Sequence, residues 1–210
     1  FNDMEIQEVS AKAYDELFPH ALCFNTAAFN RLNERKCEEI HYLIFIEKKI
    51  RLGLIVGSRN TCWESPFSAP FGGFTTLQPG IRIPFIERAV DALELYAFQC
   101  QVNKLVITLP PLFYEEAFLT KTAHVLYRKN WLLDQFDLDY YCDLSVHDAV
   151  LSMMSATARQ KVRVALRSPF TFEKGEGLKS LEIAYDIVAS NRSEKGYPLS
   201  MSRDEMIKTA

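Results

Sequence analysis

The stretch ESPFSAPFGGF, residues 64–74, differs from an ordinary strand and from an ordinary surface loop. It holds two of the nine prolines, two of the eight glycines and three of the fifteen phenylalanines of the chain. Proline cannot donate to a strand ladder and glycine packs no side chain, so a regular buried strand avoids both. A solvated loop would avoid so many aromatic rings. The stretch therefore predicts an irregular, apolar strand that breaks its own hydrogen-bond ladder.

The segments around this stretch alternate between strand and helix patterns. Two strand-like runs before it have almost no linker between them, which predicts a β-hairpin. After it, apolar residues recur at helical spacing, at Ile86, Val90, Leu93, Ala97 and Phe98. In chain order we expect a strand at 4–10, helices at 11–22 and 25–36 (the second capped by Asn25 or Thr26), hairpin strands at 40–49 and 50–60, a helix at 83–101, a strand at 103–111, a helix at 112–130 and one or two strands at 131–145. This order predicts an α/β fold, a mixed sheet flanked by helices on both faces.

The composition changes beyond residue 146. A helix is expected at 147–168, a short strand at 169–177, a helix at 178–196 that ends near Gly196, and the start of another helix at 201–210. Strand, helix, helix is also how the chain begins. We therefore expect a first domain at 1–146, a linking helix at 147–168 and, at 169–210, the incomplete start of a second, similar domain whose natural chain continues past Ala210.

Composition and charge exclude several classes of protein. The formal net charge is −3, which lacks the broad basic footprint of a dedicated nucleic-acid binder. The number of cysteines is odd, and neither the cysteines nor the histidines show the spacing of metal ligands. The cysteines are Cys23, Cys37, Cys62, Cys100 and Cys142, and the histidines are His20, His41, His124 and His147. We therefore expect neither a metal site nor a disulfide framework. No apolar run has the length of a membrane span, and a cytoplasmic location is expected.

The order of elements resembles the GNAT acyltransferase fold. The segments SATARQKVRVALRSPFTFEKGEG (155–177) and YDIVASNRSEKG (185–196) resemble the FemAB-like branch, in which two GNAT-like domains stand in tandem in bacterial proteins. SPFSAPFGGF, residues 65–74, also looks like the corresponding part of such proteins. The resemblance implies a fourth strand that carries a bulge and splays from its neighbour to leave a cleft. Trp63, Phe67, Phe71 and Phe74 would line that cleft, or would fill the core beneath a bent strand.

The resemblance also bears on the acyl donor. GNAT domains that use acyl-CoA carry a loop of the form Gln/Arg-x-x-Gly-x-Gly/Ala, whose N–H groups cradle a pyrophosphate. Here the equivalent place reads QPGIRI, Gln78–Ile83, with a shorter spacing and a proline that has no N–H. This departure argues against coenzyme A binding by the first domain, although Arg82 could meet a phosphate as a side-chain cation. We expect no tightly bound cofactor, and acyl-CoA or aminoacyl-tRNA would be the donor substrate of the full-length protein.

In FemAB-like proteins the first domain helps to hold the acceptor, a cell-wall precursor with a nucleotide diphosphate or lipid pyrophosphate, and the second domain receives aminoacyl-tRNA. The matching hinge here is ARQKVRVALR, residues 158–167. Arg159, Arg163 and Arg167 fall on one helical stripe, suited to a diphosphate because guanidinium forks pair bidentately with its oxygens. The alternative is a solvated amphipathic face opposite Val162, Ala165 and Leu166, with Lys161 pointing elsewhere.

The chemistry that the resemblance implies is attack of an amine on an activated acyl carbon. Glu64, beside the expected cleft, and Tyr114, Glu115 and Glu116 are candidates for proton handling, or else a helix-start acid pair and a core tyrosine. No residue is assigned as catalytic. The first expectation is an acyl or aminoacyl transferase of GNAT/FemAB-like type, with this chain holding mainly the acceptor side and Trp63, Glu64, Phe67, Phe71, Arg82 and the three hinge arginines as substrate-binding residues. The alternatives are an acyl-CoA-dependent N-acetyltransferase and a non-catalytic binding module on the same fold.

Overall fold

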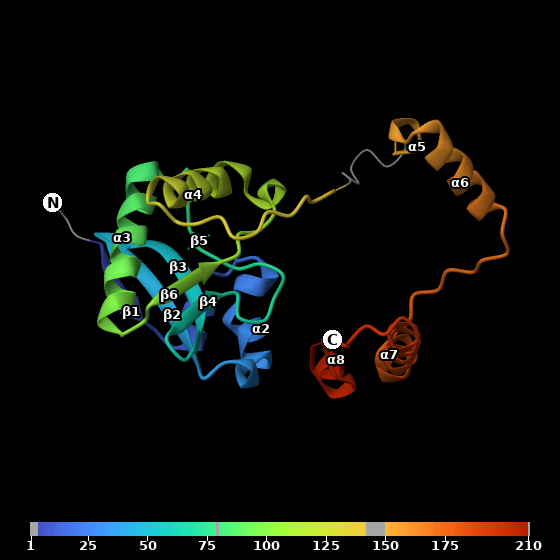
Figure 1. Ribbon diagram of the computed structural model, residues 1–210, viewed down its shortest axis with the longest axis horizontal. Coiled ribbons are helices and arrows are strands. Elements are labelled where there is room, and N and C mark those ends of the chain that lie inside the picture. The colour runs from blue at the N-terminus through green and yellow to red at the C-terminus, as the bar shows by residue number, and fades with distance from the viewer. Residues whose placement is uncertain (1–3, 79, 142–149, 210) are drawn as a thin grey trace. The chain divides into compact units, whose positions relative to one another are not determined.

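The computed structural model describes residues 4–78, 80–141 and 150–209 (Figure 1). The chain divides into two units, Phe1–Gln135 and Phe136–Ala210, which are described separately. The first unit contains a six-stranded mixed sheet, and the described residues of the two units together contain eight α-helices. The expected α/β fold with a mixed sheet is confirmed.

The sheet has the order β1-β2-β3-β4-β6, with the short β5 also paired to β3. Its strands are β1 Glu5–Glu8, β2 Glu39–Glu47, β3 Lys49–Arg59, β4 Cys62–Ser65, β5 Thr75–Thr76 and β6 Lys104–Ile107. β2 and β3 form the predicted antiparallel hairpin, whose turn contains Lys48 at φ 60°. β4 and β6 are parallel and are joined by a crossover that contains α3.

One face of the sheet is covered by α1 Ala11–Leu17, the short turn η1 Cys23–Asn25, α2 Ala27–Leu32 and the turn η2 Glu34–Lys36. Ser10 caps α1, and Thr26, one of the two expected caps, accepts from the N–H of Phe29 at 3.2 Å to start α2. Asp15 of α1 accepts hydrogen bonds from Ala27 and Ala28 and so ties the two helices together. The core of this face consists of Tyr14, Phe18, Ala27, Tyr42, Ile44 and Ile55.

The other face is covered by α3 Ile83–Gln99 and α4 Glu116–Arg128, the latter preceded by the turn η3 Leu112–Tyr114 (Figure 1). Ile86, Val90, Leu93 and Ala97 of α3 are buried against the sheet, as their spacing predicts. Phe98 is 78% exposed, because it lies one residue beyond the buried stripe of a helix that is about to end. Helices therefore cover both faces of the sheet, as expected.

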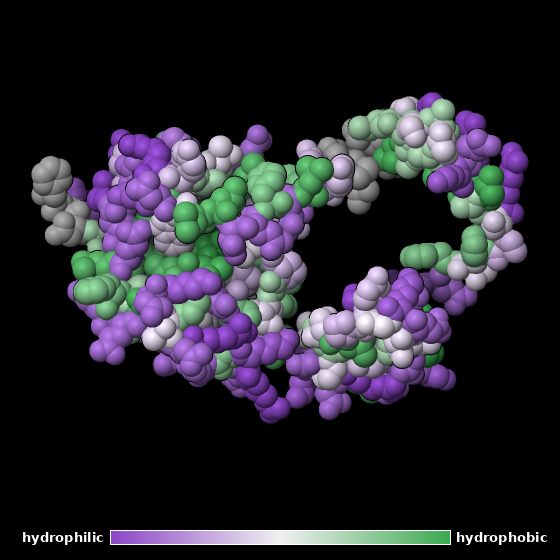
Figure 2. All heavy atoms as spheres, in the orientation of Figure 1, coloured by the Kyte–Doolittle hydropathy of each residue, from purple (hydrophilic) through white to green (hydrophobic). Residues whose placement is uncertain are grey.

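The strand expected at 131–145 is not formed in its described part. Residues 131–141 contain no strand, and 142–145 lie outside the described residues. Phe136, Leu138 and Tyr140 alternate with acidic residues as in a strand, yet they remain 72–87% exposed. Figure 2 shows hydrophobic side chains on the surface along this segment. The alternation supplies one face of a strand, but a strand also needs a neighbour for its backbone groups.

The second unit is helical. It contains α5 Val150–Met153, α6 Ala156–Leu166, α7 Gly177–Glu194 and α8 Arg203–Thr209. The single helix expected at 147–168 is divided, because Ser155 has a non-helical backbone and its hydroxyl accepts from the N–H of Ala158. The strand expected at 169–177 is also wrong: this segment contains no strand, and Phe172 is 98% exposed. The end of α7 near Gly196 (φ 69°) is as predicted.

α7 and α8 are joined by polar contacts. Arg203 forms ion pairs with Glu182 and Asp186, and its guanidinium lies over the ring of Tyr185. No described helix is both long enough and apolar enough to cross a bilayer.

Candidate functional site

The sheet is interrupted where the sequence predicts it. β4 ends at Ser65 and β5 begins at Thr75, so the loop 66–74 leaves the sheet and returns to it. β4 pairs with Gly57–Arg59 of β3, whereas β5 pairs with Leu52 and Gly53. The middle of β3 consequently has no strand beside it on this edge. The prediction of a strand that breaks its own ladder is confirmed.

The interruption leaves the backbone of Ile55 without a strand partner on that edge. In an antiparallel sheet successive residues direct their N–H and C=O groups to opposite neighbours. The carbonyl of Tyr42 in β2 accepts from the N–H of Val9, so the backbone groups of Tyr42 face β1. Those of its neighbours His41 and Leu43 therefore face β3, where their partners are Val56 and Leu54. Ile55 must then face the interruption. No hydrogen bond joins its backbone to the loop 66–74.

The ends of the loop are fastened to β6. The N–H of Gly72 donates to the C=O of Thr108 at 2.8 Å, and the N–H of Thr108 donates to the C=O of Ser65 at 2.8 Å. The hydroxyl of Ser65 accepts from the N–H of Gly73 at 2.9 Å. A side chain on Gly72 would meet the backbone nitrogen of Pro66 at 2.7 Å, and Gly73 has φ +88°. The two glycines therefore permit a close approach and a left-handed turn that other residues would resist.

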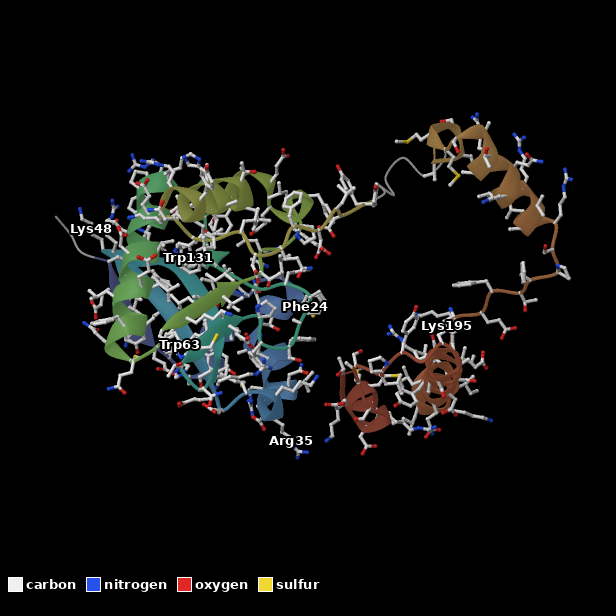
Figure 3. All side chains as sticks on the ribbon, in the orientation of Figure 1. Phe24, Arg35, Lys48, Trp63, Trp131 and Lys195 are labelled. Atoms are coloured by element: carbon white, nitrogen blue, oxygen red, sulfur yellow. The ribbon has the colours of Figure 1, made fainter. Side chains whose placement is uncertain are left out.

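Three of the four aromatic residues expected to line a cleft or to fill the core are buried. Trp63 is 3% exposed and contacts His41 and Tyr96, among the strands in Figure 3. Phe67 is 5% exposed and lies against Gly57, while Phe74 packs edge-on to Phe45. This burial is what the alternative of rings that fill the core beneath a bent strand predicts.

Phe71 is the exception, because it belongs to a partly exposed group of rings. Its ring centroid lies 4.9 Å from that of Phe24 and 5.3 Å from that of Tyr114. Phe24 also contacts Phe29, and Tyr114 also contacts Phe113. We call these five residues the aromatic cluster; Figure 3 labels Phe24. Tyr114 and Phe113 are 49% and 41% exposed, so the cluster reaches the surface.

The aromatic cluster lies where the two parallel strands end. Phe71 follows β4 and Tyr114 follows β6, and their contact brings the two post-strand segments together. In α/β sheets, ligands bind outside the carboxyl ends of parallel strands. Phe24 and Phe29 lie in η1 and α2, far in sequence from Phe71 and Tyr114. No periodic pattern in the sequence predicts that they join the aromatic cluster.

The candidate proton-handling groups have different surroundings. Glu64 accepts from Arg59 at 2.5 Å, and the same guanidinium donates to the carbonyls of Lys36 and Phe67 at 2.8 Å. Glu64 is thus held as the counterion of an arginine that fastens the loop. Partial desolvation raises the pKa of the Glu115 carboxyl above its usual value, although the residue keeps much of its surface. Glu116 is exposed in the first turn of α4, where the helix dipole favours an acid.

Two backbone N–H groups of the loop before α3 are bonded within the loop. The N–H of Gln78 donates to the hydroxyl of Thr76, and the N–H of Ile81 donates to the carbonyl of Gln78. Pro79 lies outside the described residues. Arg82 is exposed at the N-cap of α3, with its guanidinium 5.3 Å from the ring centroid of Phe85.

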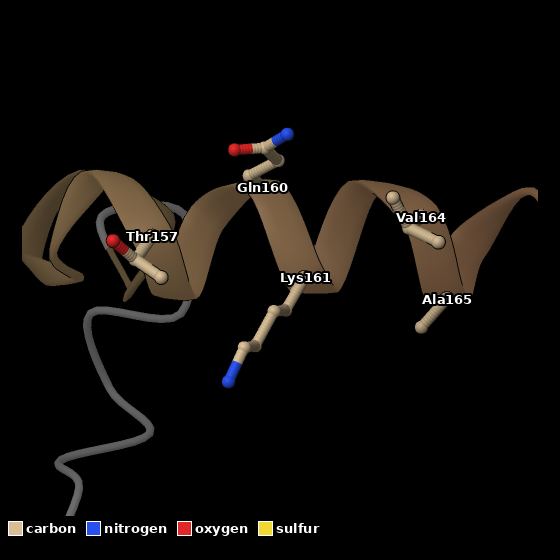
Figure 4. Close-up of a pocket in the computed structure, with 5 residues that line it drawn as sticks. All are labelled: Thr157, Gln160, Lys161, Val164 and Ala165. Carbon is tan, nitrogen blue, oxygen red and sulfur yellow. The ribbon is translucent and has the colours of Figure 1, made fainter.

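The predicted arginine stripe belongs to the second unit. Arg159 and Arg163 are in α6 and Arg167 caps its end, all on one side of the helix. Arg163 and Arg167 are exposed, but so is Leu166 on the face expected to be apolar and packed. A shallow groove on α6 is lined by Thr157, Gln160, Lys161, Val164 and Ala165 (Figure 4). All five come from one helix, so the groove has no opposite wall and we assign it no ligand.

The described residues contain no group of three His, Cys, Asp or Glu side chains that could hold a metal ion. Cys142 and His147 lie outside them. No model of a known protein family matches the chain, and a search of curated proteins finds no matching relative.

Proposed function

We propose that this chain is part of an acyl or aminoacyl transferase of GNAT/FemAB-like type and holds the acceptor of the reaction at the aromatic cluster. The observation that carries the proposal is the contact between Phe71 and Tyr114, 5.3 Å between ring centroids, at the carboxyl ends of β4 and β6. Two parallel strands with a crossover helix between them form a binding edge there. A partly exposed set of rings at that edge provides apolar area for a substrate.

The interruption of the sheet supports the same proposal. An acyl-transfer site needs hydrogen-bond donors for the oxygen on which charge develops. The backbone N–H of Ile55, which has no strand partner on that edge, is such a donor. The loop 66–74 between β4 and β5 is held by the bonds of Ser65, Gly72 and Gly73 and by the bond from Arg59 to the carbonyl of Phe67. Glu115, next to Tyr114, has a raised pKa and so is closer to the range in which a carboxylate can take a proton from an ammonium group.

The acceptor is proposed to be an amine-bearing small molecule such as a cell-wall precursor with a diphosphate. The donor is acyl-CoA or aminoacyl-tRNA, used by the full-length protein, with any tRNA contact made by its second domain. A cytoplasmic location fits such donors.

Binding of the acceptor tests the proposal directly. A cell-wall precursor that carries a nucleotide diphosphate is titrated into the chain by calorimetry. Phe71→Ala should weaken binding at least about tenfold, because the aromatic cluster loses the ring that contacts both Phe24 and Tyr114. Phe98→Ala, an exposed phenylalanine on α3, is the matched control. Equal affinity for both variants would overturn the assignment of the aromatic cluster.

Transfer assays separate the alternatives. Mass spectrometry of the acceptor after incubation with acetyl-CoA, or with aminoacyl-tRNA, detects the added group. Transfer from acetyl-CoA by the isolated chain would favour the N-acetyltransferase. Acceptor binding without transfer from either donor, by the full-length protein as well, would favour the non-catalytic binding module.

A further inference from the structure

A groove opens on the face of the sheet that α1 and α2 cover, beside the start of β2. It has a volume of about 390 Å³, enough for a small organic group. Its apolar lining consists of Ala11, Ile40 and Tyr42, and we call it the Tyr42 groove. In Figure 3 the labelled Arg35 marks the turn η2, which supplies Glu34 to the lining. The groove thus combines side chains from elements that are separated in sequence.

The charges that line the Tyr42 groove do not balance. The lining contains three carboxylates, those of Glu34, Glu38 and Glu39, and all three residues are exposed. Arg31 is the one cation of the lining, because the two basic residues of η2 are not part of it. Three negative charges therefore face one positive charge. Such a groove attracts a cation rather than an anion.

The three carboxylates differ in how far they are already used. Glu38 accepts from the N–H of Asn60 at 3.0 Å, and Glu39 lies 3.9 Å from Nε2 of His41. The carboxylate of Glu34 makes no hydrogen bond or ion pair with any other described residue. Glu34 therefore keeps its full capacity to accept hydrogen bonds from a ligand.

The Tyr42 groove also contains a hydroxyl without a partner. Tyr42 is 8% exposed, and its ring packs against that of Tyr14, 5.9 Å between centroids. Its hydroxyl is buried and has no hydrogen-bond partner within the described chain. Burial raises the pKa of this phenol to about 12, and the charges of Arg31 and Glu34 also act on it, so the hydroxyl lies on the groove side. A buried hydroxyl without a partner is costly, and a donor that enters the groove would remove this cost.

We propose that the Tyr42 groove binds a guanidinium group. This planar cation has five N–H donors, so it can pair bidentately with the carboxylate of Glu34 and also donate to the hydroxyl of Tyr42. It is more weakly hydrated than an ammonium ion, so its transfer to a groove with apolar walls costs less. Ala11 and Ile40 provide apolar surface for the alkyl stem that carries it. The site shares no residue with the aromatic cluster and does not depend on the transferase proposal.

The test is NMR titration of the isotope-labelled chain with N-propylguanidinium at neutral pH and about 0.15 M KCl, where unspecific surface attraction is screened. We expect saturable shifts of the amide signals around the groove. Tyr42→Phe should weaken binding at least about tenfold, the loss of one charge-assisted hydrogen bond. The hydroxyl that it removes has no partner in the described chain, so this variant should fold normally. Glu34→Gln should weaken binding about threefold or more, as for an exposed ion pair. Glu5→Gln, at an exposed glutamate of β1, is the control.

Two further probes test the fork and identify the source of the guanidinium. N-propylammonium has the same stem and charge without the fork, and should bind more weakly. A blocked Gly-Arg-Gly peptide that competes with N-propylguanidinium would assign the groove to arginine side chains of a polypeptide. Binding of N-propylguanidinium alone would assign it to a small guanidino compound, and both results support the proposal. Equal binding of N-propylammonium would overturn it, as would saturable binding that Tyr42→Phe and Glu34→Gln leave unchanged, or no saturable binding at all.

Discussion

The hydroxyl of Ser65 accepts a hydrogen bond from the backbone N–H of Gly73 at 2.9 Å in a buried setting. The bond spans the loop 66–72, so it holds together the two ends of the interruption in the sheet. Ser65 is 2% exposed, which leaves water little access to the amide if the hydroxyl is removed. The loop that carries Phe71 therefore depends on one small polar side chain at the end of β4.

Replacing that side chain should lower stability. Ser65→Ala leaves the N–H of Gly73 buried without its acceptor, and the free energy of unfolding is expected to fall by about 1–3 kcal/mol. Urea unfolding followed by circular dichroism measures this. Thr108→Ala is the control, because Thr108 is exposed and bonds to Ser65 and Gly72 only through its backbone. A loss no larger than that of the control would show that the hydroxyl does not hold the loop.

Glycine is required at position 72 by close approach. A Cβ there would lie 2.7 Å from the backbone nitrogen of Pro66 and 2.9 Å from the carbonyl carbon of Ser65. Backbone atoms cannot turn aside as a side chain can, so Gly72→Ala is expected to cost about 1–3 kcal/mol and to weaken the bond to Thr108. Gly80→Ala places its Cβ in open space and should change stability by less than about 0.5 kcal/mol. Thermal unfolding of the two variants compares them, and equal melting temperatures would contradict the steric argument.

These glycines also show what could be predicted from the sequence. Pro66, Pro70, Gly72 and Gly73 identified the interruption because each has a local backbone effect that one sequence displays. The hairpin and the helices α3 and α4 followed from period and caps for the same reason. The strand expected at 131–145 was wrong in its described part because alternation gives a face but no partner strand. The burial of Trp63, Phe67 and Phe74 depended on which side of the sheet each ring faces, which composition does not contain.

The candidate site was harder to predict than the fold. Phe71 and Tyr114 were identified separately, one from its breaker-rich stretch and the other from its place after two prolines. Their contact with Phe24 joins segments of distant sequence position. The Tyr42 groove likewise combines Glu34 of η2 with Ala11 of α1. Such groupings arise from the strand order, and a single sequence contains no signal for them.

Arg59 should be a larger determinant of loop stability than its partial exposure suggests. Its guanidinium donates to the carbonyl of Lys36, to Glu64 and to the carbonyl of Phe67, and so joins three segments. Arg59→Ala removes all three bonds and is expected to cost about 1–2 kcal/mol after allowance for solvent screening. Chemical unfolding measures the loss, with Arg35→Ala as the exposed control. Glu64→Gln keeps an acceptor for Arg59 and should retain most of the stability; a loss as large as that of Arg59→Ala would make the charge of Glu64 the dominant contribution.

The buried phenols of Tyr14 and Tyr42 predict how stability depends on alkaline pH. Burial raises the pKa of Tyr42 from 10.0 to about 12 and raises that of Tyr14 as well. Thr75 lies beside Tyr14 and lowers its pKa in part, yet their hydroxyls lack the geometry of a hydrogen bond. Neither phenol has a hydrogen-bond partner within the described chain. Well below pH 10, as at pH 8, both phenols are neutral in the folded and unfolded states and do not make stability pH-dependent.

Above pH 10 the unfolded chain loses these phenolic protons first, so the free energy of unfolding should fall as the pH rises toward about 12. Tyr42→Phe removes one of the two groups and should make this fall shallower. At pH 8 the same variant should change stability by less than about 0.5 kcal/mol, because the hydroxyl that it removes has no partner to lose. Urea unfolding at pH 8, 10 and 11 measures both effects. Tyr127→Phe, at a tyrosine that is 80% exposed, should follow the unmodified protein at every pH. If the stability of Tyr42→Phe also falls with pH as steeply as that of the unmodified protein, the prediction is wrong, and the phenol of Tyr42 ionises in the folded protein as readily as in the unfolded chain.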